Sequence, residues 1–277
     1  MQNDELNINV PTKGDLPREA DFKATVNLED YVNQKPPNKG FGYEQHVQLI
    51  QPWSVPVFKT TLPPDILSTM LEISDQVIAD KNTQHFGKHL AGSIETELLI
   101  KHEILKQAGV MEFFLEATRQ FVVTCLSQAN PFTIDKILEE EWFTQMLNMW
   151  IVSQQPEEYN PVHIHTNCQM SSVMYLKIPK KLPGRKDHRP EDDGAILFTS
   201  NAGTDLDFCV PSIAISPQVG DFYIFGARQL HAVYPYRCAE GETETERRSI
   251  SFNAVFQSKT EFDKITEERK AKFKRGG

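Results

Sequence analysis

Two histidines alternate with apolar residues in the segment Asn160–Thr166, where His163 and His165 stand two positions apart. A third histidine, His231, follows much later in the chain, after the run Gly220–Phe225. Residues two apart on a strand point to the same face, so His163 and His165 could enter one cavity to which a distant strand presents His231. Two near ligands and one remote ligand on β structure suit a metal that keeps open coordination positions. We therefore predict a metal centre formed by these three histidines.

Cys168 closely follows His165 and is a further candidate ligand. The simpler interpretation is a small apolar side chain near a strand. The other cysteines are Cys125, Cys209 and Cys238, and none of the four forms a C-x-x-C pair. Scattered cysteines of this kind are typical of reduced, mostly buried thiols in a cytosolic protein.

The composition narrows the class of protein. The chain has 277 residues, of which 39% are hydrophobic and 24% charged, so it can form one large globular domain or two small ones. Its net charge of −9 disfavours nucleic acid and anionic membranes as partners. No apolar run is long enough to cross a bilayer, and the polar, acidic start is unlike a signal peptide. We therefore predict a cytoplasmic protein with neither a nucleic-acid nor a membrane partner.

The N-terminal half must supply the support for the site. Residues 1–50 are polar and contain Pro, Asn, Lys and Gly clusters, which predicts an extended arm that could mediate homo-oligomerisation. A short edge strand is expected at residues 55–60, because Pro56 cannot donate a hydrogen bond. Helices are expected within residues 61–141, one opening at Pro63 and Pro64 and one over residues 103–127. Core packing explains their apolar stripes.

From Trp142 the pattern becomes that of β structure. Strands are expected at residues 145–153, 162–166, 171–178, 194–199, 207–216, 221–225, 232–236 and 248–256. Many short strands separated by Gly, Pro and Asn turns indicate a sandwich or barrel. We expect one domain over residues 51–258, with helical support at 61–141, a β core at 142–258 and a charged helix or tail at 259–277.

Four motifs in this order resemble the 2-oxoglutarate/Fe(II)-dependent oxygenases. They are His163-Ile164-His165, then Ser171–Leu176 with Pro179, then Gly220–Phe225 with His231–Pro235, and finally Arg247–Asn253. The order and spacing are similar to a branch found in marine bacteria and cyanophages. The resemblance runs from about Trp53 to Phe256 and is stronger in the C-terminal half.

This resemblance implies an α+β fold whose core is a double-stranded β-helix (a jelly roll, cupin-like) with supporting N-terminal helices. It implies Fe(II) as the metal and 2-oxoglutarate as a small-molecule cosubstrate that chelates the iron through its keto-acid end. The implied reaction hydroxylates a C–H bond of an unidentified substrate, a small molecule or a protein, with peptidyl hydroxylation suggested by analogy alone. If the chain is viral, its location would be the host cytoplasm.

The far carboxylate of 2-oxoglutarate needs a buried cation, and arginine offers a bidentate fork for it. Arg247 suits this role better than Arg248, because Arg247 shares a strand face with Ser249, Ser251 and Asn253. Tyr175 matches the position at which related enzymes place a hydroxyl on the same carboxylate. The implied cosubstrate residues are therefore Arg247, Tyr175, Ser249 and Asn253. The alternative for Arg247 is a surface ion pair with Glu244 or Glu246.

The chain departs from the family pattern at the near pair, where the superfamily has H-x-D and this chain has His165 in place of the acid. All three histidines could bind iron, which is the interpretation we favour. His165 could instead support the site from behind, with water or a remote acid such as Asp193 as the third ligand. A third interpretation is lost activity, which would leave a non-catalytic jelly-roll structural or assembly protein. A three-histidine dioxygenase that does not use 2-oxoglutarate is a further alternative.

Overall fold

The computed structural model of this protein describes residues 55–87, 90–129, 134–180, 193–200, 210–238 and 241–275. They belong to the second of two units into which the chain divides, Trp53–Gly277. The arm expected at residues 1–50 lies outside the described residues, so the predicted domain boundaries remain a prediction. In the part of the chain that is described, no helix is long and apolar enough to cross a membrane.

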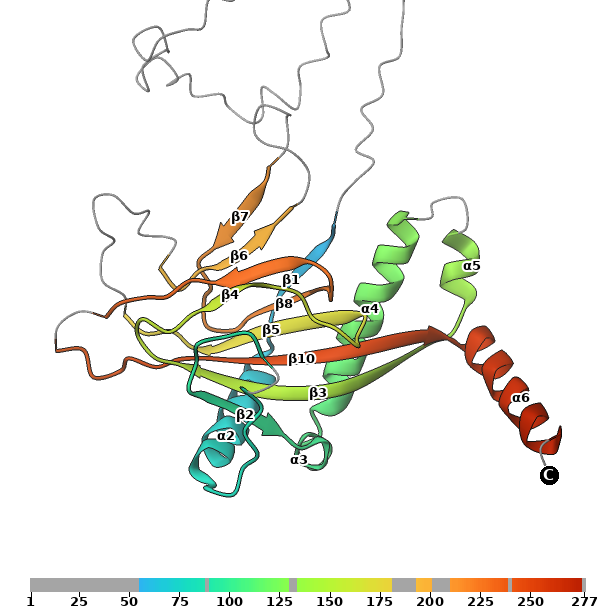
Figure 1. Ribbon diagram of the computed structural model, residues 1–277, viewed down its shortest axis with the longest axis horizontal. Coiled ribbons are helices and arrows are strands. Elements are labelled where there is room, and N and C mark those ends of the chain that lie inside the picture. Colours follow the sequence, from blue (N-terminus) through green and yellow to red (C-terminus); the bar gives the residue numbers. More distant parts are fainter. Residues whose placement is uncertain are drawn as a thin grey trace, which may run out of the picture. The chain divides into compact units, whose positions relative to one another are not determined.

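Two antiparallel sheets form the core of the described unit (Figure 1). The larger sheet has the order β1-β8-β5-β10-β3-β2, and the smaller has the order β4-β9-β6-β7. In the larger sheet the strands are β1 (Val57–Thr61), β8 (Asp221–Gly226), β5 (Met170–Lys177), β10 (Arg247–Ser258), β3 (Trp142–Gln154) and β2 (Thr96–Ile100). In the smaller sheet they are β4 (Asn160–His163), β9 (Leu230–Val233), β6 (Ile196–Thr199) and β7 (Ser212–Ile215).

The path of the chain between these sheets identifies the fold. From β3 to β10 the chain crosses repeatedly between the larger and the smaller sheet, with β6 and β7 as one hairpin inside the smaller sheet. This winding is a double-stranded β-helix, so the predicted fold class is confirmed. The strand predicted around Pro56 is β1, and it lies at an edge of the larger sheet as expected.

Helices cover the face of the larger sheet that points away from the smaller one. They are α2 (Pro64–Ala79), α3 (His102–Gln107) and α4 (Met111–Ala129), while α5 (Ile134–Glu139) packs against α4 and α6 (Lys259–Arg275) lies at the C-terminal end. Helix α2 begins with proline in its first turn, where the missing N–H costs nothing. The single helix expected over residues 103–127 is wrong. Gly109 adopts φ +73°, a conformation that glycine tolerates best, and it separates α3 from α4.

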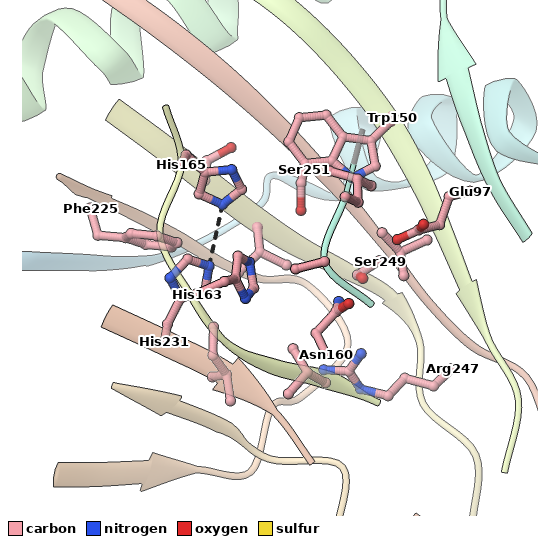
Figure 2. A pocket seen from close by; sticks show the side chains of 17 residues that line it. Glu97, Trp150, Asn160, His163, His165, Phe225, His231, Arg247, Ser249 and Ser251 are labelled. Carbon is pink, nitrogen blue, oxygen red and sulfur yellow. Dashed lines mark hydrogen bonds between the residues drawn. The ribbon is translucent and has the colours of Figure 1, made fainter. Parts of the chain in front are cut away.

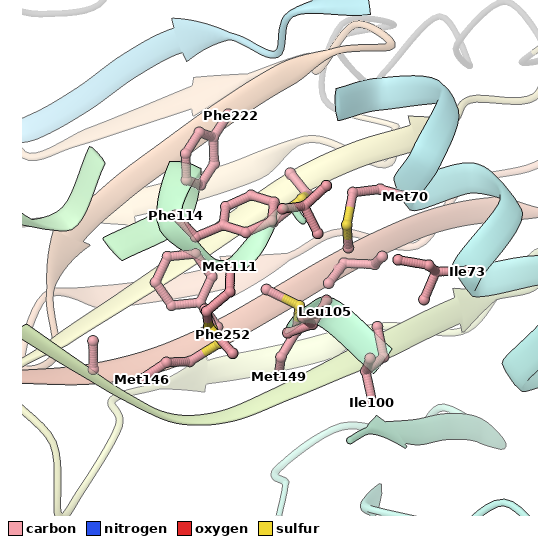
Figure 3. Close-up of a cluster of buried hydrophobic side chains, with 14 of the residues drawn as sticks. Met70, Ile73, Ile100, Leu105, Met111, Phe114, Met146, Met149, Phe222 and Phe252 are labelled. Carbon is pink, nitrogen blue, oxygen red and sulfur yellow. The ribbon is translucent and has the colours of Figure 1, made fainter. Parts of the chain in front are cut away.

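The larger sheet separates two environments because alternate residues of each strand point to opposite faces. On β8, Phe222 and Ile224 pack into the main core beneath the helices, while Tyr223 and Phe225 pack toward the smaller sheet. In the main core the ring of Phe114 lies 5.9 Å from that of Phe222 and 5.8 Å from that of Phe252 (Figure 3). The apolar core is therefore concentrated on the helix side, and the space between the sheets can hold polar groups.

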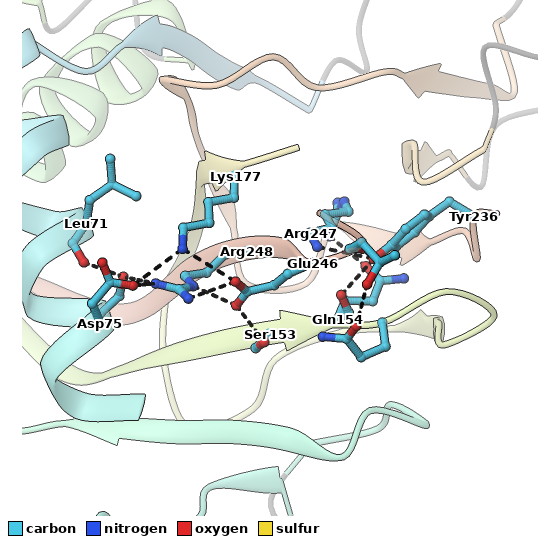
Figure 4. Close-up of polar contacts among 12 residues, drawn as sticks. Leu71, Asp75, Ser153, Gln154, Lys177, Tyr236, Glu246, Arg247 and Arg248 are labelled. Carbon is cyan, nitrogen blue, oxygen red and sulfur yellow. Dashed lines mark hydrogen bonds and ion pairs between the residues drawn. The ribbon is translucent and has the colours of Figure 1, made fainter. Parts of the chain in front are cut away.

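Arg248 joins β10 to the helix layer (Figure 4). Its guanidinium donates hydrogen bonds to the Ser74 hydroxyl at 2.8 Å, to the Asp75 carboxylate, and to both carboxylate oxygens of Glu246 at 2.7 Å. The Arg248 side chain is buried. The hydrogen bond from Arg248 holds the pKa of Asp75 below its ordinary value. A buried arginine that meets two carboxylates here ties the sheet to α2.

We predict that Arg248→Ala lowers the free energy of unfolding by about 3 kcal/mol or more, because it leaves the half-buried Glu246 carboxylate without its main partner. Urea unfolding at neutral pH measures the change. Lys177→Ala is the matched control, because the Lys177 side chain is 40% exposed and contacts the same two carboxylates. We expect it to cost at most about 1 kcal/mol. Equal losses in the two variants would contradict the assignment of the network to Arg248.

Candidate metal centre

The three predicted histidines lie together at one end of the space between the sheets (Figure 2). His163 is the last residue of β4 and pairs across the sheet with His231 on β9, with ring centroids 4.2 Å apart. The Nε2 atoms of His165 and His231 are 3.3 Å apart. The three candidate ligand atoms all lie within 4.8 Å of one another. The structure therefore brings together the cluster that the sequence predicted.

His165 reaches this cluster by a different route from the one expected. We predicted a strand over residues 162–166, but β4 ends at His163, so strand alternation does not position His165. Instead the backbone N–H of His165 donates a hydrogen bond to the Ala227 carbonyl at 2.8 Å. This bond holds the segment after β4 against the connection between β8 and β9. The ring of His165 then lies 6.0 Å from the indole of Trp150.

Hydrogen bonds to the backbone orient two of the imidazoles. The Nδ1 atom of His163 lies 2.7 Å from the Pro161 carbonyl oxygen, and that of His231 lies 2.8 Å from the Gln229 carbonyl oxygen. A carbonyl oxygen can only accept, so each Nδ1 carries the proton and each Nε2 has a lone pair, which in His231 faces Nε2 of His165 at 3.3 Å. This is the arrangement by which outer hydrogen bonds prepare histidines for a metal.

Burial also keeps the three imidazoles neutral. It lowers the pKa of His165 to about 4 and that of His231 to about 3, and neighbouring His163 adds to both shifts. Burial likewise lowers the pKa of His163. Metal binding requires neutral imidazole. The cluster is therefore ready to bind a cation at neutral pH without first losing protons.

The donor set fits a first-row transition metal. Imidazole ligands suit iron, zinc, copper and nickel. The 3.3 Å between two Nε2 atoms is near the separation of about 3 Å expected for neighbouring ligands that each lie roughly 2.1 Å from one ion. Among the described residues, no carboxylate or thiolate joins the three histidines. Asp193, the remote acid we considered, pairs instead with Arg237 at 3.4 Å, and Cys168 lies outside the cluster.

Arg247 lies in the same pocket and has no acidic partner among the described residues (Figures 2 and 4). Its side chain is 1% exposed. Nη1 donates to the Gln154 amide oxygen at 2.7 Å, whereas Nε and Nη2 have no partner. The surface ion pair considered for Arg247 is wrong, because Arg247 is buried and Glu246 pairs with Arg248. A buried guanidinium with two unsatisfied nitrogens is costly, so it indicates a site for an anion.

The other predicted cosubstrate residues divide between two places. The ring of Tyr175 stacks under the Arg247 guanidinium at 4.8 Å, and its buried hydroxyl has no hydrogen-bond partner. Ser249, which pairs with Tyr175 across β5 and β10, lines the same pocket. Asn253 stands six positions from Arg247 along β10, which is roughly 20 Å of strand. It lines an adjacent groove beside His163 and His165, so the structure does not bring it to the Arg247 end.

One further pocket residue escaped the sequence analysis. Glu97 on β2 is 1% exposed and lines the pocket that contains the histidines and Arg247. Its Oε1 atom has no hydrogen-bond partner in the part of the chain that the structure describes. Burial, and secondarily the charge of Glu158, raises the pKa of Glu97 to about 7. The only sequence signal is an acid within the short apolar run Thr96–Ile100, which was not predicted to be a strand.

Comparison with known proteins gives one family match. Residues 148–253 match the family described as "Putative 2OG-Fe(II) oxygenase". That segment extends from β3 to β10 and contains His163, His165, His231 and Arg247. A search of curated proteins found no match to this chain.

Similar solved structures exist at low sequence identity. A Pseudomonas putida prolyl-4-hydroxylase is 16% identical, with a TM-score of 0.45 over 73% of this chain and 93% of that one. A 2OG-Fe(II) oxygenase family oxidoreductase from Burkholderia pseudomallei is 12% identical, with a TM-score of 0.42 over 71% and 85%. A collagen prolyl hydroxylase of Paramecium bursaria Chlorella virus-1, solved with 2OG, is 13% identical, with a TM-score of 0.40 over 72% and 94%. Identities this low do not transfer a substrate.

We predict that His165→Ala weakens Fe(II) binding by about 100-fold or more, because it removes a ligand rather than a supporting contact. His165→Asp should keep most of the affinity, since a carboxylate is the usual third ligand beside two histidines. Anaerobic equilibrium dialysis against Fe(II) measures both variants. The control is His85→Ala, at an exposed histidine outside the cluster. Unchanged affinity in His165→Ala would assign His165 a supporting role.

We also predict that Glu97→Gln stabilises the protein in a pH-dependent way. The folded-state pKa of Glu97 is near 7 and its ordinary value is 4.5. Between these values the folded protein keeps a proton that the unfolded chain releases, so the stability of the native protein falls as the pH rises. The free energy of unfolding of Glu97→Gln should differ little from that of the native protein below pH 4.5. Above pH 7 it should be higher by about 3 kcal/mol.

Urea unfolding of both proteins between pH 4.5 and 8 tests this expectation. Glu95→Gln is the matched control, because Glu95 is exposed and stands two residues away in the sequence. We expect the pH-dependent gain in the free energy of unfolding from the Glu97 substitution. A constant difference for Glu97→Gln would mean that the Glu97 carboxyl is hydrated or paired.

Proposed function

We propose that this protein is an Fe(II)- and 2-oxoglutarate-dependent dioxygenase that hydroxylates a C–H bond of its substrate, because residues 148–253 match the family described as "Putative 2OG-Fe(II) oxygenase". The metal ligands would be His163, His165 and His231, and Arg247 would bind the far carboxylate of 2-oxoglutarate. The observation on which the proposal mainly depends is the buried Arg247 guanidinium, which lacks an acidic partner among the described residues and shares a pocket with the histidines.

A dicarboxylate suits both ends of this pocket. One end offers neutral imidazoles to a cation, and the other offers two unpaired guanidinium nitrogens. The unpartnered Tyr175 hydroxyl lies beside Arg247 and can donate a hydrogen bond to the same carboxylate. A charge-assisted fork from Arg247 and a hydroxyl from Tyr175 would satisfy all three orphaned polar groups at once.

The chain's own residues would orient the reactants and exclude water. When bound, the iron would supply oxygen activation: one atom of O2 would enter the succinate that forms as 2-oxoglutarate loses CO2, and the other would convert the substrate C–H group into C–OH. Apolar side chains of Val173, Ile196 and Phe225 line the pocket that contains Arg247 and the histidines. Burial of this kind keeps bulk water from the reacting groups and strengthens the electrostatic contacts. The protein's part in the reaction is therefore binding, orientation and dryness.

The three-histidine set has an electrostatic consequence. Three neutral imidazoles leave the full charge of Fe(II) uncompensated, whereas a carboxylate ligand would cancel part of it. The dianion of 2-oxoglutarate would neutralise the ion when it binds. A three-histidine dioxygenase that does not use 2-oxoglutarate is the second candidate, favoured by the lack of a carboxylate beside the cluster among the described residues. The Arg247 anion site favours the first candidate.

Other aspects of the function stay predictions. They are the peptidyl substrate, the cytoplasmic location and the absence of nucleic-acid and membrane partners. Homo-oligomerisation through residues 1–50 depends on a segment outside the described residues. If the protein binds no metal, the interpretation that it is a non-catalytic jelly-roll module would hold.

We predict a visible metal-to-ligand charge-transfer band when 2-oxoglutarate is added anaerobically to the Fe(II)-loaded protein, because chelation by the keto acid creates it. Absorption spectroscopy with a dialysis measurement of bound iron separates the candidates. Iron bound without a band would favour the dioxygenase that does not use 2-oxoglutarate. No bound iron would favour the non-catalytic module.

The variant Arg247→Ala tests the anion site in the same assay. We expect it to weaken 2-oxoglutarate binding by about 100-fold or more, because a buried charge pair loses one partner. Fe(II) affinity should change little. Arg228→Ala is the control, because Arg228 is exposed and outside the pocket. Equal 2-oxoglutarate affinity in Arg247→Ala and the native protein would remove the Arg247 assignment.

A further inference from the structure

The position of Glu97 follows from the register of the larger sheet. Glu97 on β2 lies opposite Val152 on β3, and Val152 lies opposite Ser249 on β10. These three residues form one row across the sheet, on the face that lines the pocket. The neighbouring Leu98 is buried in the main core on the opposite face. The pleat of β2 therefore directs Glu97 toward the metal centre (Figure 2).

The surroundings of Glu97 give its carboxyl little compensation. The side chains of Ile94, Trp150 and Val152 form a small apolar cluster on this side of the sheet, and Phe86 and Leu90 pack against it. No lysine or arginine among the described residues forms an ion pair with Glu97, and Oε1 has no hydrogen-bond partner. A buried carboxyl of this kind is costly, and the fold would be served as well by an apolar residue. An unpartnered acid in a pocket indicates a binding role.

Gly87 reinforces this interpretation. A Cβ atom at position 87 would lie 2.8 Å from Oε2 of Glu97. The glycine therefore leaves room for the carboxyl at this place in the pocket wall. Among the described residues Oε1 of Glu97 has no hydrogen-bond partner, so it is the open acceptor.

The cosubstrate is not the partner of Glu97. A carboxylate repels a dianion, and Arg247 already provides the cation that 2-oxoglutarate needs. The group that Glu97 lacks is a strong donor, best a cationic nitrogen. The indole of Trp150 lines the same pocket as Glu97, and aromatic faces favour cations. Carboxylate and aromatic wall together describe a site for an ammonium or guanidinium group.

A wider groove of about 610 Å³ adjoins the pocket that contains Glu97. The groove and the pocket share Leu90, Ala91, His163 and His165. A substrate in the groove would thus lie against the metal ligands and could extend one end past Leu90 to Glu97. The target C–H bond would be held near the histidines while the cationic end is anchored.

We propose that Glu97 is the specificity residue of this enzyme, and that the substrate carries a protonated amine or a guanidinium which pairs with the Glu97 carboxylate. The proposal rests on the proposed function, because the anchored molecule is the substrate to be hydroxylated.

Two matched pairs of small probes test it. Nα-acetyl-arginine amide is compared with Nα-acetyl-citrulline amide, and Nα-acetyl-lysine amide with its Nε-acetylated form, so that each pair differs mainly in charge. Anaerobic equilibrium dialysis measures binding to the full chain with Fe(II) and 2-oxoglutarate. We expect the native protein and Glu95→Gln to bind at least one charged probe about 10-fold more tightly than its neutral partner.

The preference should disappear in Glu97→Gln and persist in reduced size in Glu97→Asp, which keeps the charge. No preference for either charged probe in the native protein would overturn the proposal, and so would an unchanged preference in Glu97→Gln. The charge-transfer band is recorded on the same samples. An intact band with no charge preference refutes the role of Glu97 alone, whereas a native protein without the band refutes the proposed function.

Discussion

Consecutive arginines on β10 lie on opposite faces of the larger sheet, and the organisation of the molecule depends on this separation. Arg248 points to the helix layer, where Asp75 and Glu246 neutralise it. Arg247 points between the two sheets, where among the described residues it meets an amide and a tyrosine ring but no acid. One guanidinium therefore stabilises the fold, and the other is left with unsatisfied nitrogens in a pocket. The alternation of a single strand produces both outcomes.

The pocket is energetically unfavourable without ligands, and the opposite face of the sheet offsets this. The pocket combines three neutral imidazoles with the Arg247 cation and the Glu97 acid, neither of which has an ion-pair partner among the described residues. The main core beneath the helices is continuous and apolar, with Phe114, Phe222 and Phe252 in edge contacts. Proteins tolerate buried polar groups without partners at functional sites when the surrounding structure fixes their conformation. Ligands that satisfy these groups should therefore bind and stabilise the folded state together.

The double-stranded β-helix explains why residues far apart in sequence meet in this pocket. Repeated crossing between sheets places β4 beside β9, so His163 and His231 become cross-strand neighbours. The same crossing places β10 between β3 and β5, so Ser249 lies between Val152 and Tyr175. Short loops at one end of the sheets then contribute His165. The metal end and the anion end of the pocket are both consequences of strand order rather than of local sequence.

Much of this arrangement could be predicted from the sequence, because it depends on local periodicity. The alternation in Arg247–Asn253 correctly separated the faces of Arg247 and Arg248, and the motif order indicated the jelly roll. Where the backbone leaves regular structure, periodicity failed. A hydrogen bond to Ala227, not strand geometry, positions His165, and the φ of Gly109 divides the predicted helix. The sequence also placed Asn253 with Arg247 at one cosubstrate. Their separation along β10, roughly 20 Å, is longer than one small cosubstrate can span.

By itself, the sequence determined which residue types were available and which strand face each would occupy, since both follow from the covalent chain and its two-residue repeat. Only the tertiary structure decided which of them remain unpaired. Glu97 became a pocket acid because β2 joins the edge of the sheet beside β3. Arg247 meets no acid among the described residues, and the neighbouring Glu246 is paired with Arg248. Pairing of charges is a property of neighbours in space, which one-dimensional periodicity does not contain.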